Sequence, residues 1–160
     1  MSRDIRFSLN GAAVTVAAPE DEPLLFVLRN RLGFRATHFG CGLEQCGACV
    51  VGVDGEARYA CTLPVQDVTG TKVVTAEGLS AHPIGAALLA AFDSEHAGQC
   101  GYCLAGILVS AFLLLSADPE PDRDKIIAAL DKHLCRCGAH GNILRAIDRA
   151  AAILRESAAG

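Results

Sequence analysis

The sequence lacks three features that would indicate a nucleic-acid-binding, exported or membrane-spanning protein. Its 14 Lys and Arg residues form no run and its formal net charge is −4, so we expect no nucleic-acid partner. Residues 1–4 lead into alternating apolar and polar positions rather than into an apolar leader, so we expect a cytoplasmic protein unless a signal-bearing partner exports it. The most apolar stretch, 104–115, is shorter than the roughly 20 residues of a membrane helix, and we expect no membrane span.

Apolar residues and cysteines are what the sequence has in quantity. Hydrophobic residues make up 51% of the 160 positions, which is enough for a buried core in one domain or two small ones. Eight cysteines without an export signal are better explained as metal ligands than as disulfides, because the cytoplasm keeps thiols reduced. The cysteines fall into two groups of four with none left over. We therefore expect two metal sites with four ligands each.

The first group of cysteines has the spacing C-x4-C-x2-C, and a fourth cysteine follows after eleven residues. This spacing is typical of plant-type 2Fe-2S ferredoxins, in which two irons need four thiolates. Gly40, Gly42 and Gly47 stand beside these cysteines, where residues without a Cβ let the backbone turn its N–H groups towards sulfur. A zinc site or free buried thiols are the alternatives. The predicted ligands are Cys41, Cys46, Cys49 and Cys61.

The second group combines a C-x2-C motif with a C-x-C motif, and 31 residues separate the two. The first motif lies at the expected start of a helix, where exposed N–H groups stabilise thiolates. By themselves these residues fit zinc as well as an iron-sulfur cluster, because four thiolates commonly form a structural zinc tetrahedron. The members of this group are Cys100, Cys103, Cys135 and Cys137.

The first half of the chain has the alternating pattern of strands. Apolar and polar residues alternate on both sides of Asn10-Gly11, which predicts an opening β-hairpin. A helical pattern follows over 24–32, and Asp54-Gly55 is the expected turn of a second hairpin that brings the fourth cysteine back to the third. A short strand over 72–76 completes a small α+β domain, which we predict over residues 1–78.

From residue 79 the apolar period changes to about 3.6, the period of a helix. Helices are predicted over 83–95 and 103–115, and Asn142 is a candidate cap for a last one. Another is marked by the apolar residues Ile126, Ile127, Leu130 and Leu134. Four helices with short connections predict a compact bundle over residues 79–160. The five histidines lack metal-ligand spacing, and we expect them at the surface or as helix caps.

Three stretches of the sequence together resemble one protein family. They are 40–49, 99–103 and 135–138, which read GCGLEQCGAC, QCGYC and CRCG. Because they occur jointly and in this order, residues 5–151 are similar to the small iron-sulfur subunit of the molybdenum hydroxylases, the xanthine oxidase and aldehyde oxidoreductase family. The likeness is strongest to the isoquinoline or nicotinate dehydrogenase type. One departure is Leu104-Ala105 before Gly106, where many relatives carry a small polar residue and proline.

The resemblance implies an N-terminal β-grasp domain like plant ferredoxins, a helical 2Fe-2S-binding domain, and the role of an electron-transfer subunit in an oxidoreductase. It implies a large partner subunit that holds molybdopterin cytosine dinucleotide and hydroxylates an N-heterocycle or an aldehyde. Gln99 is expected to contact the pterin, and Cys137 to approach its edge. Electrons are expected to pass from the second cysteine group to the first and then to a flavin subunit or a cytochrome. No catalytic residue is expected in this chain.

The alternative function is a free-standing ferredoxin-like carrier whose helical domain is held together by a structural zinc ion. Four irons and four sulfides per chain are the expectation for the relay protein, against two irons and one zinc for the carrier. Phe39 and Tyr102 lie beside the cysteine motifs. They either shield the metal sites from water or only pack against their neighbours.

Overall fold

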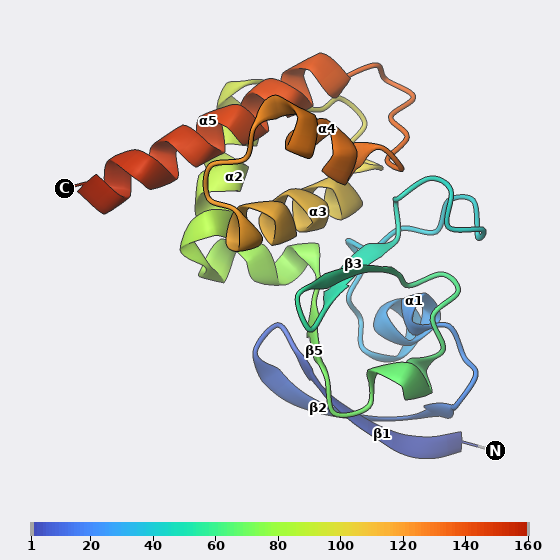
Figure 1. Cartoon of the computed structure of the whole chain (residues 1–160). Coiled ribbons are helices and arrows are strands. Elements are labelled where there is room, and N and C mark those ends of the chain that lie inside the picture. Colours follow the sequence, from blue (N-terminus) through green and yellow to red (C-terminus); the bar gives the residue numbers. More distant parts are fainter. Residues whose placement is uncertain (1, 160) are drawn as a thin grey trace.

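The computed structural model describes residues 2–159 and contains a β-sheet part packed against a helical part (Figure 1). Met1 and Gly160, the outer ends of the two predicted domains, lie outside the described residues. The α+β class expected from the sequence is confirmed. In chain order the elements are β1 (Ser2–Leu9), β2 (Ala12–Pro19), α1 (Leu24–Phe26), a π-helical turn (Val27–Arg31), β3 (Val50–Val53), β4 (Glu56–Tyr59), a 3-10 turn (Val65–Val68), β5 (Lys72–Val74), a 3-10 helix (Ala76–Ala81), α2 (Pro83–Ser94), α3 (Leu104–Ala117), α4 (Arg123–Leu130) and α5 (His140–Ala159).

The strands form one mixed sheet in the order β2-β1-β5-β3-β4. β1 and β2 pair antiparallel around Asn10 (φ 52°) and Gly11 (φ 87°), the positive-φ turn that suits a twisted hairpin. Asp54 and Gly55 make the same kind of turn between β3 and β4, at φ 49° and 89°. β5 joins the hairpins by pairing parallel with β1 and antiparallel with β3. The result is the β-grasp arrangement expected for this domain.

The core of the first domain lies between the sheet and the helix that follows β2. Alternation along β1 buries Ile5 and Leu9 on one face, and Leu24 and Leu28 join them in the same cluster. The predicted helix over 24–32 is helical but not uniform. After the single turn of α1, the N–H of Leu32 donates to the carbonyl of Val27, five residues back, at 3.1 Å, which is the π-helical pattern.

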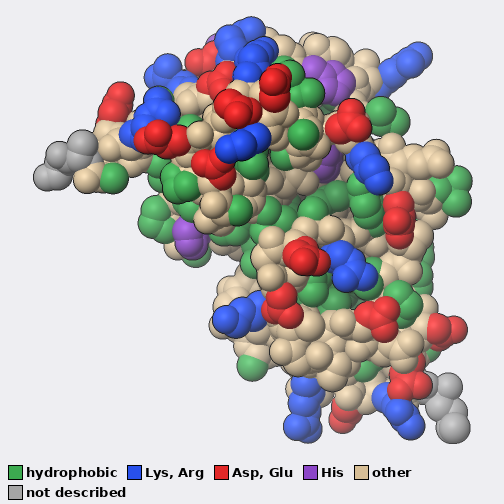
Figure 2. All heavy atoms as spheres, in the orientation of Figure 1, with side chains coloured by type: hydrophobic (Ala, Val, Ile, Leu, Met, Phe, Trp, Pro, Cys, Tyr) green, Lys and Arg blue, Asp and Glu red, His purple; other side chains and the backbone are tan. Residues whose placement is uncertain are grey.

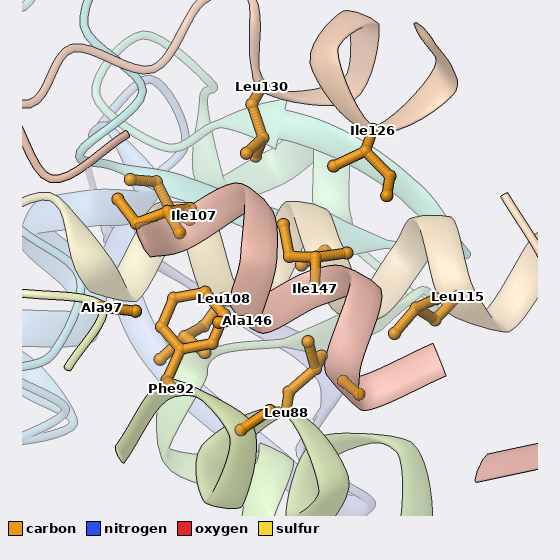
Figure 3. Packing of buried hydrophobic residues seen from close by; sticks show 14 of the residues in the cluster. Leu88, Phe92, Ala97, Ile107, Leu108, Leu115, Ile126, Leu130, Ala146 and Ile147 are labelled. Carbon is orange, nitrogen blue, oxygen red and sulfur yellow. The ribbon is translucent and has the colours of Figure 1, made fainter. Parts of the chain in front are cut away.

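The four helices α2 to α5 pack around a second core, as predicted for the residues that the structure describes. Figure 3 shows Leu88 and Phe92 of α2, Ile107 of α3, Leu130 of α4 and Ile147 of α5 pointing into it. Each fully buried leucine or isoleucine of this kind contributes about 1.5–3 kcal/mol of transfer free energy. Packing of apolar faces therefore holds together the segments that carry the second cysteine group.

Two expectations about the helical domain are wrong. Leu134 is not part of the third helix, because α4 ends at Leu130. Leu134 is 62% exposed, and its N–H donates across the domain boundary to the carbonyl of Cys46 at 3.0 Å. Asn142 does not cap the last helix, which already begins at His140. Its Nδ2 instead donates to the carbonyls of Glu95 and His96, each at 3.1 Å, and so ties α5 to the end of α2.

The two domains pack against each other along β3. Val50 of β3 belongs to the helical core, and a Cβ placed on Gly52 of β3 would lie 3.2 Å from Leu113 of α3. The 3-10 helix Ala76–Ala81 crosses residue 78. The domain boundary at 78/79 remains a prediction.

The surface carries both kinds of charge. Figure 2 shows Lys and Arg interspersed with Asp and Glu on the visible face, rather than separated into patches. Large apolar side chains are nevertheless exposed beside the cysteine segments, namely Phe39, Leu43, Tyr102 and Leu134. Among the helices of residues 2–159, none combines the length and the apolar character that crossing a membrane requires.

Candidate metal centres

The first cysteine group lies where the loop after the π-helical turn enters β3. Cys41 and Cys46 are partly buried on this loop, whereas Cys49, just before β3, and Cys61, just after β4, are buried. The hairpin closes the group, because the N–H of Ala60 donates to the carbonyl of Cys49 at 3.1 Å. The predicted return of the fourth cysteine to the third is therefore found in the structure.

Backbone N–H groups point at the sulfur atoms of this loop. Cys41 Sγ accepts hydrogen bonds from the N–H of Leu43 at 3.3 Å and of Gln45 at 3.2 Å, and Cys46 Sγ accepts one from the N–H of Cys41 at 3.4 Å. Gly40 makes room for this, since a Cβ there would lie 2.6 Å from Cys46 Sγ. Donors aimed at sulfur stabilise thiolates and the negative charge of a cluster.

The thiols of this group differ in pKa. Burial raises the pKa of Cys41, but the N–H groups of Leu43 and Gln45 outweigh it and lower that pKa to about 7. Burial raises the pKa of Cys49 to about 12, although the backbone N–H of Cys61 opposes the rise. Since metal ligation needs thiolates, Cys49 requires the positive charge of a metal to lose its proton near neutral pH.

The second cysteine group is assembled from two separate segments. Cys103 is buried at the N-cap of α3, as the sequence predicts, and Cys100 is exposed just before it. Cys135 and Cys137 lie in the turn between α4 and α5, where both are partly buried. The turn is closed by the N–H of Gly138, which donates to the carbonyl of Cys135 at 3.3 Å.

The pKa values of the second group follow the same logic. Burial raises the pKa of Cys103 to about 12. Burial also raises that of Cys135, but hydrogen bonds, first among them the N–H of Ala139, leave the pKa below its usual value. The N–H of Tyr102 and then the side chain of Cys137 lower the pKa of Cys100. Each group thus combines a buried thiol whose pKa is raised with at least one thiol whose pKa is lowered.

Within each group the thiols interact as pairs. The thiol of Cys46 lowers the pKa of Cys41, and the thiol of Cys61 raises that of Cys49. The second group pairs in the same way, through the contacts Cys100–Cys137 and Cys103–Cys135. Across residues 2–159, no three His, Cys, Asp or Glu side chains converge closely enough to hold one metal ion. Two pairs per site supply the four thiolates that a cluster of two irons requires.

The two cysteine groups lie on either side of the domain boundary. The carbonyl of Cys46 accepts the N–H of Leu134, the neighbour of Cys135. On another side, His38 Nδ1 lies 3.0 Å from the carbonyl of Tyr102 and the two rings stack at 4.4 Å. Tyr102 Oη donates to the carbonyl of Phe39 at 2.6 Å. Tyr102 and Phe39 are both about half exposed, so they join the loops of the two groups more than they cover them.

Gln99 lies at the surface next to the second group. Its Nε2 is 3.4 Å from the carbonyl of Cys137, and it lines a cavity of about 370 Å³ with Leu104 and Leu108 of α3 among its walls. The cavity therefore lies beside the segment that carries Cys100. The pterin contact predicted for Gln99 stays a prediction.

His133 is the residue whose importance the sequence pattern did not reveal. The expectation of a surface or capping position holds for His82, whose Nδ1 accepts the N–H of Ile84 at the start of α2, but it is wrong for His133. That side chain is only 5% exposed and lies 2.8 Å from Ser110 Oγ. Burial lowers its pKa to about 4. The spacing of Ile126, Leu130 and His133, at i, i+4 and i+7, is the signal that could have placed it on an inward face.

Comparison with known proteins agrees with this geometry. Residues 7–72 match the family of 2Fe-2S iron-sulfur cluster binding domains, and residues 75–148 match a 2Fe-2S binding domain family. The chain therefore contains two 2Fe-2S-binding domains. Its structure also superposes on the crystal structure of quinoline 2-oxidoreductase from Pseudomonas putida 86, with a TM-score of 0.90, 31% identity and 97% of each chain covered.

Two curated relatives are similar over almost their whole length. One nicotinate dehydrogenase component, from Pseudomonas putida, is 42% identical over 156 residues, which cover 98% of this chain and 99% of the relative. The alpha chain of isoquinoline 1-oxidoreductase from Brevundimonas diminuta is 46% identical over 151 residues, which cover 92% and 97%. These matches confirm the resemblance found in the three cysteine motifs. The chain belongs to the family of small 2Fe-2S iron-sulfur subunits of the molybdenum hydroxylases.

Proposed function

We propose that this chain relays single electrons from a molybdopterin site, held by a large partner subunit, to an external acceptor. When bound, each 2Fe-2S cluster supplies one-electron redox chemistry. The observation that supports the proposal best is the pairing of thiols in two groups that meet across one domain boundary. The chain contributes no substrate chemistry of its own, and its residues hold, insulate and align the two redox groups.

We assign the ligands of the two clusters by these pairs. Cys41 and Cys46 of the loop and the buried Cys49 and Cys61 of the β3–β4 hairpin would hold the first cluster. The N–H groups aimed at Cys41 Sγ stabilise the more negative, reduced state and so raise the potential. The proposed ligand sets are Cys41, Cys46, Cys49 and Cys61 for the first cluster, and Cys100, Cys103, Cys135 and Cys137 for the second.

The large subunit is proposed to dock at the exposed side of the second group. Cys100 is exposed, Cys137 is partly buried, and Gln99 beside them is exposed with its amide near the carbonyl of Cys137. A carboxamide can donate and accept at once, which suits the edge of a pterin ring. We assign Gln99 to contact molybdopterin cytosine dinucleotide and Cys137 to approach that cofactor.

The names of the relatives, which refer to nicotinate, isoquinoline and quinoline, favour an N-heterocycle over an aldehyde as substrate.

The acceptor is proposed to approach the loop of the first group. Leu43, between Cys41 and Cys46, is 67% exposed, and Phe39 is also exposed. An apolar rim around a redox group favours close, transient contact with a partner. A flavin subunit or a cytochrome would meet this need. We propose that the complex is cytoplasmic. The eight cysteines are free, and the cytoplasm keeps thiols reduced, so that they can bind metal.

The competing function is a one-cluster carrier with a zinc-stapled helical domain. The experiment that separates the two is the low-temperature EPR spectrum of the anaerobically purified, dithionite-reduced chain, with iron and zinc measured on the same sample. We expect two distinct S = 1/2 signals and about four irons per chain. A single signal with about one zinc per chain would overturn the relay and leave a structural role for the second group.

A further inference from the structure

The two cysteine groups approach each other through a contact that admits no side chain. Gly106 of α3 lies against Gly47 of the first cysteine loop, and a Cβ on Gly106 would stand 1.9 Å from the carbonyl oxygen of Gly47. Gly47 itself has φ +73°, and a Cβ there would stand 2.2 Å from His133 Nδ1. Real Cβ atoms do not approach other atoms this closely, so an added methyl group at either glycine forces the two domains apart locally.

His133 fills the space beside these glycines. Its Nε2 lies 2.8 Å from Ser110 Oγ on α3, its own N–H donates to the carbonyl of Leu130 at 2.8 Å, and its carbonyl lies 3.3 Å from His140 Nε2. The ring is thus held from α3, and the backbone of His133 is held from α4 and α5. Its other face lies against Gly47 in the first domain.

One atom of this ring is left without a partner. His133 Nδ1 is buried and makes no hydrogen bond within residues 2–159. A buried polar atom without a partner costs about 1–3 kcal/mol, and such atoms are few in folded proteins. A leucine of similar size would avoid that cost, so the histidine serves something other than core stability. An apolar residue cannot both fit against Gly47 as this ring does and form a hydrogen bond with Ser110.

We propose that His133, with Gly47 and Gly106, sets the separation of the two redox groups and is a positioning residue for electron transfer between them. We call the contact between Gly47, Gly106 and His133 the glycine seam. In each domain it lies next to proposed cluster ligands. Gly47 follows Cys46, and His133 lies two residues before Cys135. Electron transfer falls steeply with distance, so a small shift in the seam changes the relay without touching a ligand. The inference rests on the proposed function, because it takes both cysteine groups as cluster ligands.

The test compares the reduced, iron-loaded chain with four variants by EPR. Two S = 1/2 centres close together split and broaden each other's signals, and this interaction weakens as they separate. Gly106→Ala and His133→Ala should lose part of the interaction while both signals and the iron content remain. His133→Gln should restore most of it, because its amide nitrogen can still reach Ser110. Gly141→Ala is the matched control, since a Cβ there meets only Arg145 at 3.9 Å, and it should leave the interaction unchanged.

Three outcomes decide the matter. An unchanged interaction in Gly106→Ala with full iron content overturns the proposal. Where Gly106→Ala or His133→Ala fails to fold, Ser110→Ala carries the test, because it removes only the hydroxyl partner of His133; an unchanged interaction there also overturns it. Failure of the proposed function is seen separately, since the unaltered chain would then give one signal and contain zinc before any variant is made.

Discussion

The two cysteine groups reach similar arrangements by different routes. In the first, three of four cysteines lie within nine consecutive residues, and the sulfur of Cys41 is already bonded by N–H groups of that loop. In the second, two pairs come from segments 31 residues apart, and only the packing of α3, α4 and α5 brings them together. The first site is therefore a property of a loop, whereas the second is a property of a folded domain.

This contrast extends to exposure. Two cysteines of the first group, Cys49 and Cys61, are buried behind the hairpin, whereas only Cys103 is buried in the second. The more open group is also the one beside Gln99, on the side that we assign to the large subunit. A site that a partner covers does not need its own chain to exclude water, so the helical domain can leave its cysteines near the surface.

The largest expected effect comes from removing one buried thiol from each group. Cys49→Ser and Cys103→Ser should each lose one EPR signal and retain roughly two of about four irons per chain, because a serine oxygen replaces the thiolate poorly as an iron ligand. The measurement is iron content with the spectrum of the reduced protein. Each variant serves as the control for the other, since the surviving signal identifies which group was lost.

A different result would break the assignment. If Cys103→Ser kept both signals and released zinc, the helical group would be structural. If either variant lost both signals, the two sites would depend on each other for assembly, and the contrast between a local and an assembled site would fail.

The next effect tests whether packing holds the second site. Ile147→Ala in the helical core and Leu25→Ala in the first core each remove a fully buried side chain, and each should cost about 2–5 kcal/mol of unfolding free energy. We expect the second EPR signal to disappear at lower denaturant in Ile147→Ala than the first signal does in Leu25→Ala. The reason is that the first loop keeps three of its ligands together when the core loosens. Equal losses of the two signals would contradict this.

The sequence also predicts the first cysteine group, built by one loop, better than the second, which is assembled from two segments. The approach of Cys61 to Cys49 could be predicted from the sequence, because the turn at Asp54-Gly55 fixes the hairpin within a few residues; the assignment of the first group as cluster ligands stays a prediction. The grouping of the second set came from counting cysteines and from the family resemblance. Its spacing alone left zinc and iron equally suited, because nothing local fixes how two distant motifs meet.

The misses have a common physical cause in contacts between domains or helices. Leu134 continues the apolar spacing of α4, yet its N–H bonds to Cys46 in the other domain. His133 has its partner Ser110 on α3, 23 positions away. Asn142 is of a residue type common at helix N-caps, but its side chain donates to carbonyls at the end of α2. Sequence patterns describe one element at a time, and these residues are placed by a second one.

A smaller effect should separate the helical site from the loop site again. Asp122 caps α4, where its Oδ1 accepts the N–H of Lys125 at 2.9 Å. Asp122→Ala should cost about 1 kcal/mol of stability and loosen the helix that leads into Cys135. We expect a slightly faster loss of the second signal on warming and no change in the first, measured by EPR on samples frozen after timed incubation. Asp122→Asn, which keeps a capping oxygen, should behave like the unaltered chain.

The smallest effect concerns the link that makes the two regions one molecule. Tyr102→Phe keeps the ring stacked on His38 but removes the hydroxyl that donates to the carbonyl of Phe39; this half-exposed bond is worth about 0.5 kcal/mol. The thermal unfolding temperature should fall slightly. The two EPR signals should also be lost at temperatures that differ more, because the loops of the two sites are joined less tightly. Tyr59→Phe is the control, since Tyr59 meets Lys132 through its ring, 6.0 Å from the centroid. Equal shifts in both variants would mean that the hydroxyl bond does not couple the two sites.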